Sequence, residues 1–163
     1  MKTIYRTFFL LTISSLILFV IIFVKDKEFQ KNPLSQKTID KLIKKEKDIQ
    51  SLIQQRYRVN INFPVIIEDQ LPNNLFGLAT YKKGVIKIFL NKKRFQESEQ
   101  YMIDYVLPHE YAHAMMFYFK DFSKENGGHT KRWQTICKNI GGIKCDRFVD
   151  HHDILIEKLG GIY

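Results

Sequence analysis

The order of hydrophobic and polar residues divides the chain into segments with different periods. Residues 7–24, TFFLLTISSLILFVIIFV, form an apolar run without a charge. From Ile39 to Tyr57 the apolar residues recur about every 3.6 positions, and mainly Lys, Glu and other polar residues lie between them. This order predicts one apolar helix, followed by an amphipathic helix that Ser35 can cap and that runs to about Tyr57.

Short segments rich in β-branched and aromatic residues follow the second helix. They lie at residues 63–68, 75–81 and 85–90, and Lys82-Lys83-Gly84 separates the last two. Runs of this composition and length are typical of strands, and a short turn that contains Gly joins the strands of a hairpin. We therefore expect an α+β fold with a short antiparallel sheet.

Two more helices are expected beyond the strands. Apolar residues at spacings of one, three and four predict a largely buried helix from about Ser98 to about Phe119. Pro108 inside it has no backbone N–H and should bend the helix or mark its local start. After a polar loop, residues 131–140 form the next helix, which Gly141-Gly142 ends.

The first of these helices contains His109-Glu110-Tyr111-Ala112-His113, which has the form HExxH. Residues four apart lie on the same face of a helix, so His109 and His113 can direct imidazole nitrogens at one ion. Zn²⁺ held by two or three neutral imidazoles keeps a position open for water and lowers the pKa of that water to about 7. A neighbouring carboxylate, here Glu110, can take the proton while the water attacks a carbonyl. The motif therefore indicates metal-assisted peptide hydrolysis.

A zinc site of this type needs a third ligand, and His129 is the candidate. It follows Gly127-Gly128, which let the backbone turn sharply toward the first helix, and Trp133 can pack beneath the next helix while His129 faces the metal. The alternative is a histidine in a surface loop. The adjacent histidines 151 and 152 point different ways on regular structure, so at most one of them can approach the metal.

These residues resemble the SprT-like metallopeptidases, a family that includes Spartan. The likeness rests on the HExxH motif, the step of sixteen residues from His113 to His129, and Trp133 four residues later. The position of Pro108 directly before the motif is a further similarity to bacterial SprT proteins. The resemblance extends from about residue 38 to about residue 153.

The resemblance implies a small zincin-like domain with an HExxH active-site helix. Residues 76–91 look like the strand pair that precedes this helix in the family, and Arg147 and His151 fall where bacterial members carry a similar Arg and His. The implied site residues are the zinc ligands His109, His113 and His129, with Glu110 as the general base.

The sequence departs from the family pattern at two places. Thr130 follows the third histidine, where a small residue is usual. Many members continue into a zinc ribbon with paired cysteines, but Cys137 and Cys145 are the two cysteines of this chain and cannot form one. We expect both to be structural, either paired in an oxidising compartment or free in a reducing one.

The net charge of +9 is unevenly distributed. Residues 25–58 hold ten Lys or Arg against five acidic residues, whereas residues 59–163 hold fourteen against twelve. The excess lies beside the apolar run, where it can meet anionic lipid headgroups. The expected partners are therefore a protein or peptide substrate and membrane lipid, whereas nucleic acid is possible but not favoured. The oligomeric state stays open.

The apolar run is long enough to anchor the chain in a membrane. As a helix it spans about 27 Å, close to the thickness of a bilayer core. A cleaved signal peptide is the competing interpretation, but the run passes directly into charged residues without a small-x-small site. We therefore expect a membrane anchor and linker at residues 1–34 and the metallopeptidase domain at residues 35–163.

The side of the membrane depends on the flanking charges. Six lysines lie within twenty residues after the run, against Lys2 and Arg6 before it. The positive-inside rule then favours a cytoplasmic domain, whereas a short basic N-terminus that stays inside would place the domain outside.

Taken with the motif, these features predict a membrane-anchored, zinc-dependent metallopeptidase with Glu110 as the base. Two alternatives remain. One is a non-catalytic domain in which zinc only ties two helices together. The other is a protease that acts on DNA-associated proteins, as the likeness to Spartan suggests.

Overall fold

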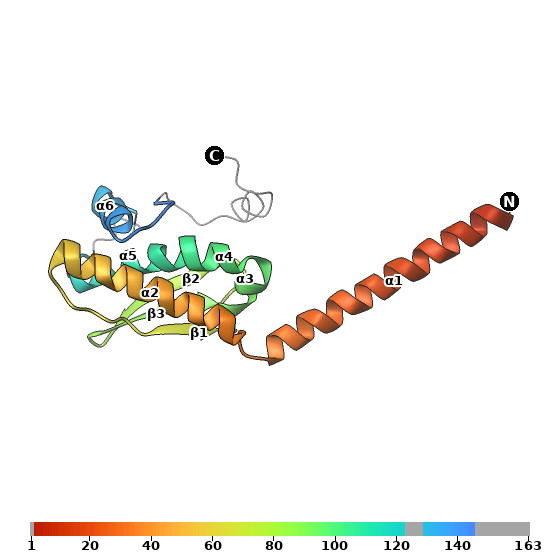
Figure 1. Ribbon diagram of the computed structural model, residues 1–163, viewed down its shortest axis with the longest axis horizontal. Helices are drawn as coiled ribbons and strands as arrows, with labels where there is room; N and C mark the ends of the chain where they lie inside the picture. Colours follow the sequence, from red (N-terminus) through yellow and green to blue (C-terminus); the bar gives the residue numbers. More distant parts are fainter. Residues whose placement is uncertain (1, 123–128, 146–163) are drawn as a thin grey trace. The chain divides into compact units, whose positions relative to one another are not determined.

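The computed structural model describes residues 2–122 and 129–145, and the chain divides into two compact units, Met1–Leu34 and Ser35–Tyr163 (Figure 1). The expectations for Gly127-Gly128, Arg147, His151 and His152 lie outside the described residues.

The first unit holds helix α1, which runs from Lys2 to Lys31 (Figure 1). Among the described residues it is the one helix that is long and apolar enough to cross a membrane, and a signal sequence meets the same criteria. Its apolar side chains are exposed, for example Phe8 at 67% and Phe19 at 66%. The predicted apolar helix is therefore confirmed, and its surface calls for an apolar environment.

The second unit begins with helix α2, Gln36–Tyr57. The Ser35 side chain accepts a hydrogen bond from the Thr38 N–H at 3.2 Å, and Arg58 ends the helix in the left-handed conformation with φ 59°. One face of α2 is buried, at positions that include Leu42, Ile49 and Ile53. The predicted cap, length and amphipathic character of this helix are confirmed.

Three strands form one sheet in the order β1-β3-β2, with β1 at Val65–Glu68, β2 at Gly77–Lys82 and β3 at Val85–Asn91. Strands β2 and β3 form the predicted antiparallel hairpin. Lys83 and Gly84 make its turn, both with positive φ, as a tight two-residue hairpin turn requires.

The expectation of a purely antiparallel sheet is wrong for β1, which pairs parallel to β3. The sheet is mixed because residues 69–76 leave a space between β1 and β2, and β3 returns from the hairpin turn into that space. Strand β3 is therefore antiparallel to β2 and parallel to β1. As the central strand, β3 holds two fully buried side chains, Ile88 and Leu90.

Helices α3, Lys92–Glu97, and α4, Glu99–Tyr101, lead into a π-helical segment η1, Met102–Val106, and then into α5, Leu107–Tyr118. In the π turn the Leu107 N–H donates to the Met102 carbonyl, five residues earlier. Pro108 explains this turn, because its ring crowds the carbonyl one α-turn before it and it cannot donate a hydrogen bond. The predicted helix from about Ser98 to about Phe119 is therefore present, with its irregular turn directly before Pro108.

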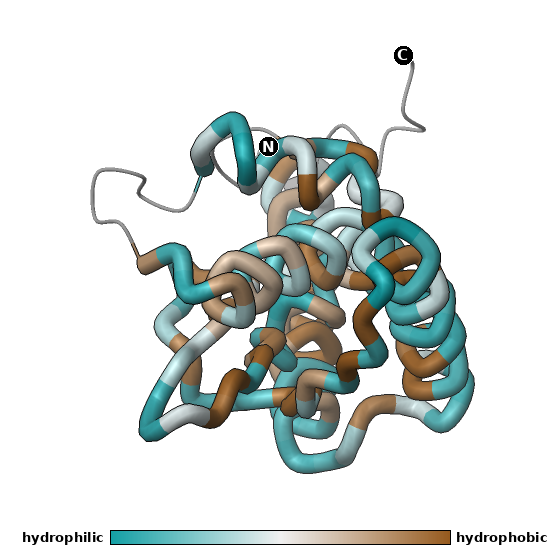
Figure 2. Tube along the Cα trace, turned by 90° about the vertical axis from the view of Figure 1, so that its left-hand side faces the viewer, coloured by the Kyte–Doolittle hydropathy of each residue, from teal (hydrophilic) through white to brown (hydrophobic). Residues whose placement is uncertain are grey.

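Helix α5 lies between the sheet and helix α6, Lys131–Asn139, and packs against β2, β3 and α6 (Figure 1). In Figure 2 the hydrophobic stretches of the strands lie inside the second unit, and α2 presents its hydrophilic turns along one side. The layers thus hold α5 in the core of the unit, between β2 and α6.

Candidate metal centre

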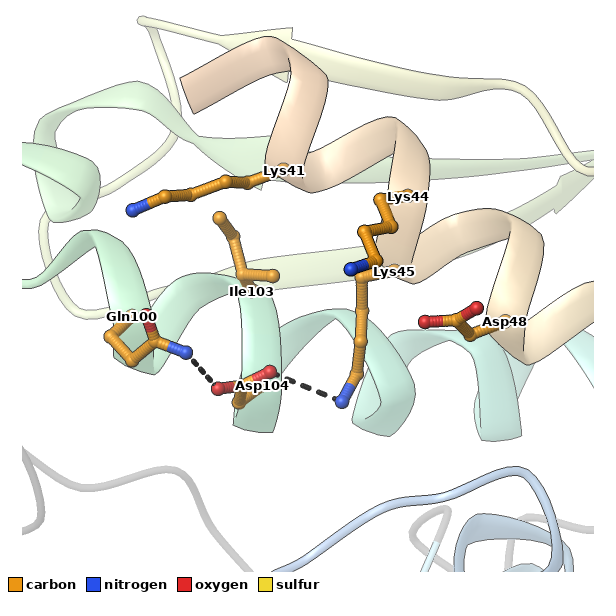
Figure 3. Close-up of a pocket in the computed structure, with 7 residues that line it drawn as sticks. All are labelled: Lys41, Lys44, Lys45, Asp48, Gln100, Ile103 and Asp104. Atoms are coloured by element: carbon orange, nitrogen blue, oxygen red, sulfur yellow. Dashed lines mark hydrogen bonds and ion pairs between the residues drawn. The ribbon is translucent and has the colours of Figure 1, made fainter. Parts of the chain in front are cut away.

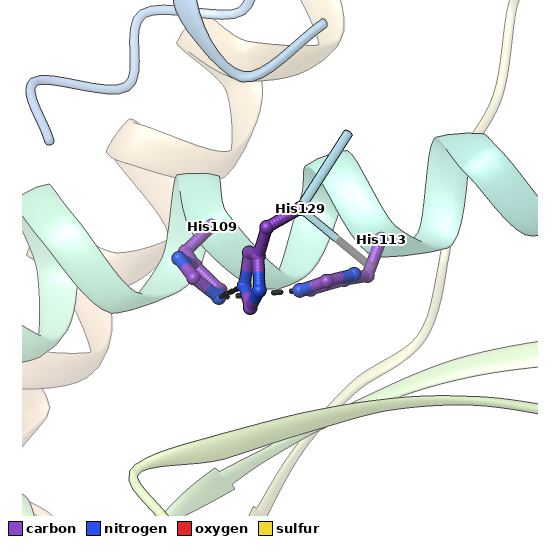
Figure 4. A group of neighbouring side chains, drawn as sticks. All are labelled: His109, His113 and His129. Carbon is purple, nitrogen blue, oxygen red and sulfur yellow. Dashed lines mark hydrogen bonds between the residues drawn. The ribbon is translucent and has the colours of Figure 1, made fainter. Parts of the chain in front are cut away.

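Three histidines from two segments meet beside α5. His109 and His113 lie one turn apart on α5, and His129 precedes α6 (Figure 4). The Nε2 atom of His109 lies 3.2 Å from Nε2 of His113 and 3.1 Å from Nε2 of His129. One ring nitrogen of each histidine lies within 4.8 Å of the other two. The structure therefore brings together the three residues for which the sequence predicts metal binding.

Trp133 holds the three imidazole rings from the α6 side. Its own ring is fully buried, and its centroid lies 4.7 Å from that of His109, 5.1 Å from His113 and 4.6 Å from His129. Thr130, directly after His129, caps α6 by accepting a hydrogen bond from the Trp133 N–H at 3.1 Å. Cap and tryptophan together fix the start of α6, and with it the position of the third histidine.

Burial keeps the two helical histidines uncharged. Desolvation by burial, together with the nearby His113 and His129 rings, lowers the pKa of His109 to about 3. The pKa of His113 falls to about 4 by burial and by the proximity of His129. At neutral pH both rings are neutral, which is the form that binds a metal.

The donor set fits a divalent metal. Zinc binds imidazole nitrogen at about 2.0–2.1 Å with tetrahedral geometry, which places two ligand nitrogens about 3.3–3.4 Å apart. The observed separations of 3.2 and 3.1 Å from His109 are close to that edge length. Imidazole ligands also suit other transition metals, so the geometry supports a metal site without fixing the element.

Glu110 lies next to the first ligand but is not part of the histidine group. Its side chain is buried, with 6% of the residue exposed. Burial raises the pKa of the Glu110 carboxyl to about 8, and a hydrogen bond with the Ala79 backbone opposes this shift. A divalent cation beside the carboxyl would lower its pKa again, because an opposite charge favours the ionised form.

Strand β2 supplies the backbone groups near Glu110. In the described part of the chain β2 has one neighbour, β3, so its other side is an edge. The Asn91 N–H donates to the Phe76 carbonyl, and alternation along the antiparallel pair then directs the backbone groups of Gly77 and Ala79 to the free edge. The Ala79 N–H is the donor that reaches Glu110.

Gly77 makes this close approach of strand and helix possible. A Cβ atom there would lie 2.7 Å from Cγ and 3.0 Å from Oε1 of Glu110. Sequence reasoning missed Gly77 and Ala79. A glycine inside a strand often marks such an approach, and that was the available signal.

Helix α2 fixes α5 on its other side. The Tyr111 hydroxyl contacts Oε1 of Glu46 at 2.7 Å, and burial raises the pKa of Tyr111 above its ordinary range. Tyr111 lies between His109 and His113 in sequence, so this bond holds the histidine-bearing segment of α5 against α2. Glu46 was also missed, because its partner is 65 residues away.

A hollow lies between α2 and the segment α4–η1, and its lining includes none of the three histidines (Figure 3). Lys45 pairs with Asp104 at 3.1 Å, and Gln100 also contacts that carboxylate. Lys41, on the same wall, pairs with Glu99 at 2.6 Å. These acids balance much of the lysine charge, so the hollow is not a strongly positive site.

Comparison with known proteins gave one match. A family model described as the SprT-like family matches residues 41–152, about two thirds of the chain. No curated protein and no solved structure matched.

Proposed function

The chain belongs to the SprT-like family, and on that premise we propose that residues 35–163 form a zinc-dependent metallopeptidase that hydrolyses peptide bonds. The observation that carries the proposal is the convergence of three imidazoles with a buried carboxyl beside them that lies outside the histidine group. The three histidines support metal binding, and the additional carboxyl of Glu110 supports catalysis.

Each residue has a defined task in this reaction. His109, His113 and His129 hold the metal. When bound, zinc polarises a substrate carbonyl and makes a water molecule more acidic. Glu110 accepts the proton of the attacking water and passes it to the leaving amine, as a general base and then a general acid.

The free edge of β2 is the proposed place for the substrate backbone. An extended peptide can pair with the edge of a strand, and the edge of β2 passes Glu110, which already accepts the hydrogen bond of the Ala79 N–H. A peptide would therefore pair with the edge groups on either side of Ala79. Pairing there would bring a peptide bond next to the histidines in a fixed orientation.

A domain that zinc only stabilises is the main alternative. Glu110 argues against it, because a structural site needs no buried carboxyl outside its ligand set. The near-balanced charge of residues 59–163 likewise gives no support to a nucleic-acid partner.

The decisive experiment is Glu110→Gln in the full chain. The variant should bind one equivalent of zinc and unfold at the wild-type temperature, while cleavage of an unfolded protein substrate falls by about 10²–10⁴-fold. Glu68→Gln, a carboxyl on β1, is the matched control and should cleave normally. If Glu110→Gln cleaved as fast as wild type, the catalytic role of Glu110 would be rejected. If the wild-type chain bound no metal, the proposed metal site would be rejected.

We also propose that α1 anchors this unit in a membrane, because the side chains of its apolar run are exposed. The cysteines support one side of the membrane over the other. The lysines after the helix favour the cytoplasm, but Cys137 and Cys145 form a disulfide, and disulfides persist mainly in oxidising compartments. Because of the disulfide, we propose that the second unit lies on the non-cytoplasmic side of the membrane.

A further inference from the structure

Three aromatic residues form an exposed cluster near the metal centre. The ring centroid of Tyr81 lies 5.0 Å from that of Phe122 and 6.4 Å from that of Phe117, and the rings of Phe117 and Phe122 stack at 5.9 Å. Tyr81 is 47% exposed and Phe122 is 49% exposed. Contiguous exposed apolar surface of this kind commonly marks a binding site.

The cluster continues the same helix face as the metal ligands. His109, His113 and Phe117 are spaced by four residues on α5, so their side chains lie along one face. At 1.5 Å per residue, Phe117 lies about 6 Å beyond His113 along the axis. The helix therefore leads directly from the metal centre to the cluster.

Strand β2 makes the same connection. Gly77, Ala79 and Tyr81 occupy alternate positions and point to one side of the strand. The first two lie against Glu110, and the third belongs to the cluster. A peptide that pairs with the edge of β2 beside Glu110 would thus reach the aromatic rings after about two further residues, at about 3.3 Å each.

We propose that Tyr81, Phe117 and Phe122 form a subsite that receives a large apolar side chain of the substrate, about two residues from the bond that is cleaved. This inference rests on the proposed peptidase function and specifies its substrate class as extended peptides with an aromatic or large aliphatic residue at that distance. The occupant is a peptide because the cluster continues a strand edge next to the catalytic groups, where backbone pairing and side-chain burial act on the same ligand.

The test uses the full zinc-loaded chain in detergent and a set of peptides in which Phe replaces Ser at one position at a time around a single cleavage site. Wild type should cleave one of these peptides about 10–100-fold faster in kcat/KM than the all-Ser peptide, as burial of one large apolar side chain allows. In Tyr81→Ser and Phe122→Ser this preference should fall below about threefold. The readout is the ratio of kcat/KM for the Phe peptide to kcat/KM for the all-Ser peptide within each variant, so a general change in activity does not enter it.

Two controls separate this subsite from general effects. Tyr118→Ser and Val85→Ser remove apolar side chains that are 42% and 50% exposed and lie outside the cluster, and both should keep the wild-type preference. The inference is overturned if wild type shows no preference at any position, or if the control variants lose it equally.

Binding measurements keep this result independent of catalysis. The same fluorescent peptides can be titrated against Glu110→Gln, where a preference for Phe that disappears with Tyr81→Ser supports the subsite even if no cleavage occurs. Cleavage without such a preference would leave the peptidase proposal intact and reject the subsite. A binding preference for Phe without any cleavage by wild type would support the aromatic cluster as a peptide-binding site and reject the peptidase proposal.

Discussion

Opposing influences act on the carboxyl group of Glu110. Burial raises its pKa to about 8, while the Ala79 backbone hydrogen bond favours the ionised form, as would a metal bound by the neighbouring histidines. A carboxyl balanced in this way can accept and release a proton near neutral pH, which general acid–base catalysis requires. This balance of influences on the pKa requires the Glu110 carboxyl to be held between α5 and β2. It therefore depends on Gly77, which leaves room for the carboxyl.

Gly77→Ala should disturb catalysis without removing the metal. The new Cβ would lie 2.7 Å from Cγ of Glu110, so the carboxyl or the strand must shift. A displacement of this size should lower kcat by about 10–100-fold, because catalytic geometry tolerates shifts of less than about 1 Å. Zinc content should stay at one equivalent, since the three atoms nearest to the new Cβ all belong to Glu110. Steady-state kinetics with metal analysis measures both quantities.

Leu78→Ala is the control for that variant. Leu78 is the next residue on β2, is 39% exposed and points to the opposite side of the strand. It should keep the wild-type kcat. If Gly77→Ala also kept it, the close packing of strand and carboxyl would have no catalytic role.

Among single residues, the sequence predicted the contacts between residues that are close along the chain and missed those between distant residues. His109, His113 and Glu110 belong to one local motif, and the spacing within a helix fixes their relation. The contacts of Gly77 and Ala79 with Glu110 join segments about thirty residues apart, and no local pattern specifies them.

At the scale of elements, α2 holds the segment that leads into the active-site helix through a short series of polar contacts. Thr38 and Lys41 both contact the carboxylate of Glu99, at 2.5 and 2.6 Å, at the start of α4. Glu46 contacts Tyr111 further along, at 2.7 Å. Because these bonds lie on successive turns of α2, they set the position of α4, η1 and α5 as one piece.

The first of these contacts predicts a pH dependence of stability. Hydrogen bonds from Lys41 and Thr38 lower the pKa of Glu99 below its ordinary value of 4.5. As the pH falls, the unfolded chain therefore binds this proton first. The contribution of Glu99 is complete above about pH 5 and is lost at lower pH, as its folded form protonates.

Glu99→Gln should therefore lower the free energy of unfolding by about 0.5–1 kcal/mol at pH 7, since partly exposed ion pairs contribute little. The difference from wild type should shrink toward zero near pH 3. Denaturant unfolding across that range measures it. Lys47→Ala, an exposed lysine on the same helix, should show no such trend, and a constant difference for Glu99→Gln at all pH values would contradict this assignment.

Elements with a strong local signal were predicted with nearly correct ends. Helix α2 has its cap residue and its apolar period, and the β2–β3 hairpin has its Lys-Gly turn. The parallel position of β1 was not predictable, because strand composition does not specify which neighbour a strand takes. The π turn before Pro108 was expected as a bend or a start, since the proline shows the location of the irregularity but not its form.

At the scale of the whole molecule, two units with different surfaces belong to one chain. The first unit exposes an apolar helix, and the second has its own core and a group of three histidines that could hold a metal. The lysines between residues 25 and 58 follow the apolar run directly. This arrangement is consistent with the proposed hydrolase, which would stay at a membrane surface and act on proteins there.

The side on which that hydrolase works can be tested through the cysteines. Cys137 and Cys145 are buried and bonded to each other, and a Cβ on Gly142 would lie 2.5 Å from Sγ of Cys137, so the glycine leaves room for the bridge. We therefore expect an alkaline phosphatase fused to the C-terminus to be active and a green fluorescent protein fused there to be dark. Both thiols should react with maleimide only after reduction. A fluorescent fusion together with free thiols would place the unit in the cytoplasm, as the flanking lysines favour, and would show that the charge distribution outweighs the disulfide as a guide to orientation.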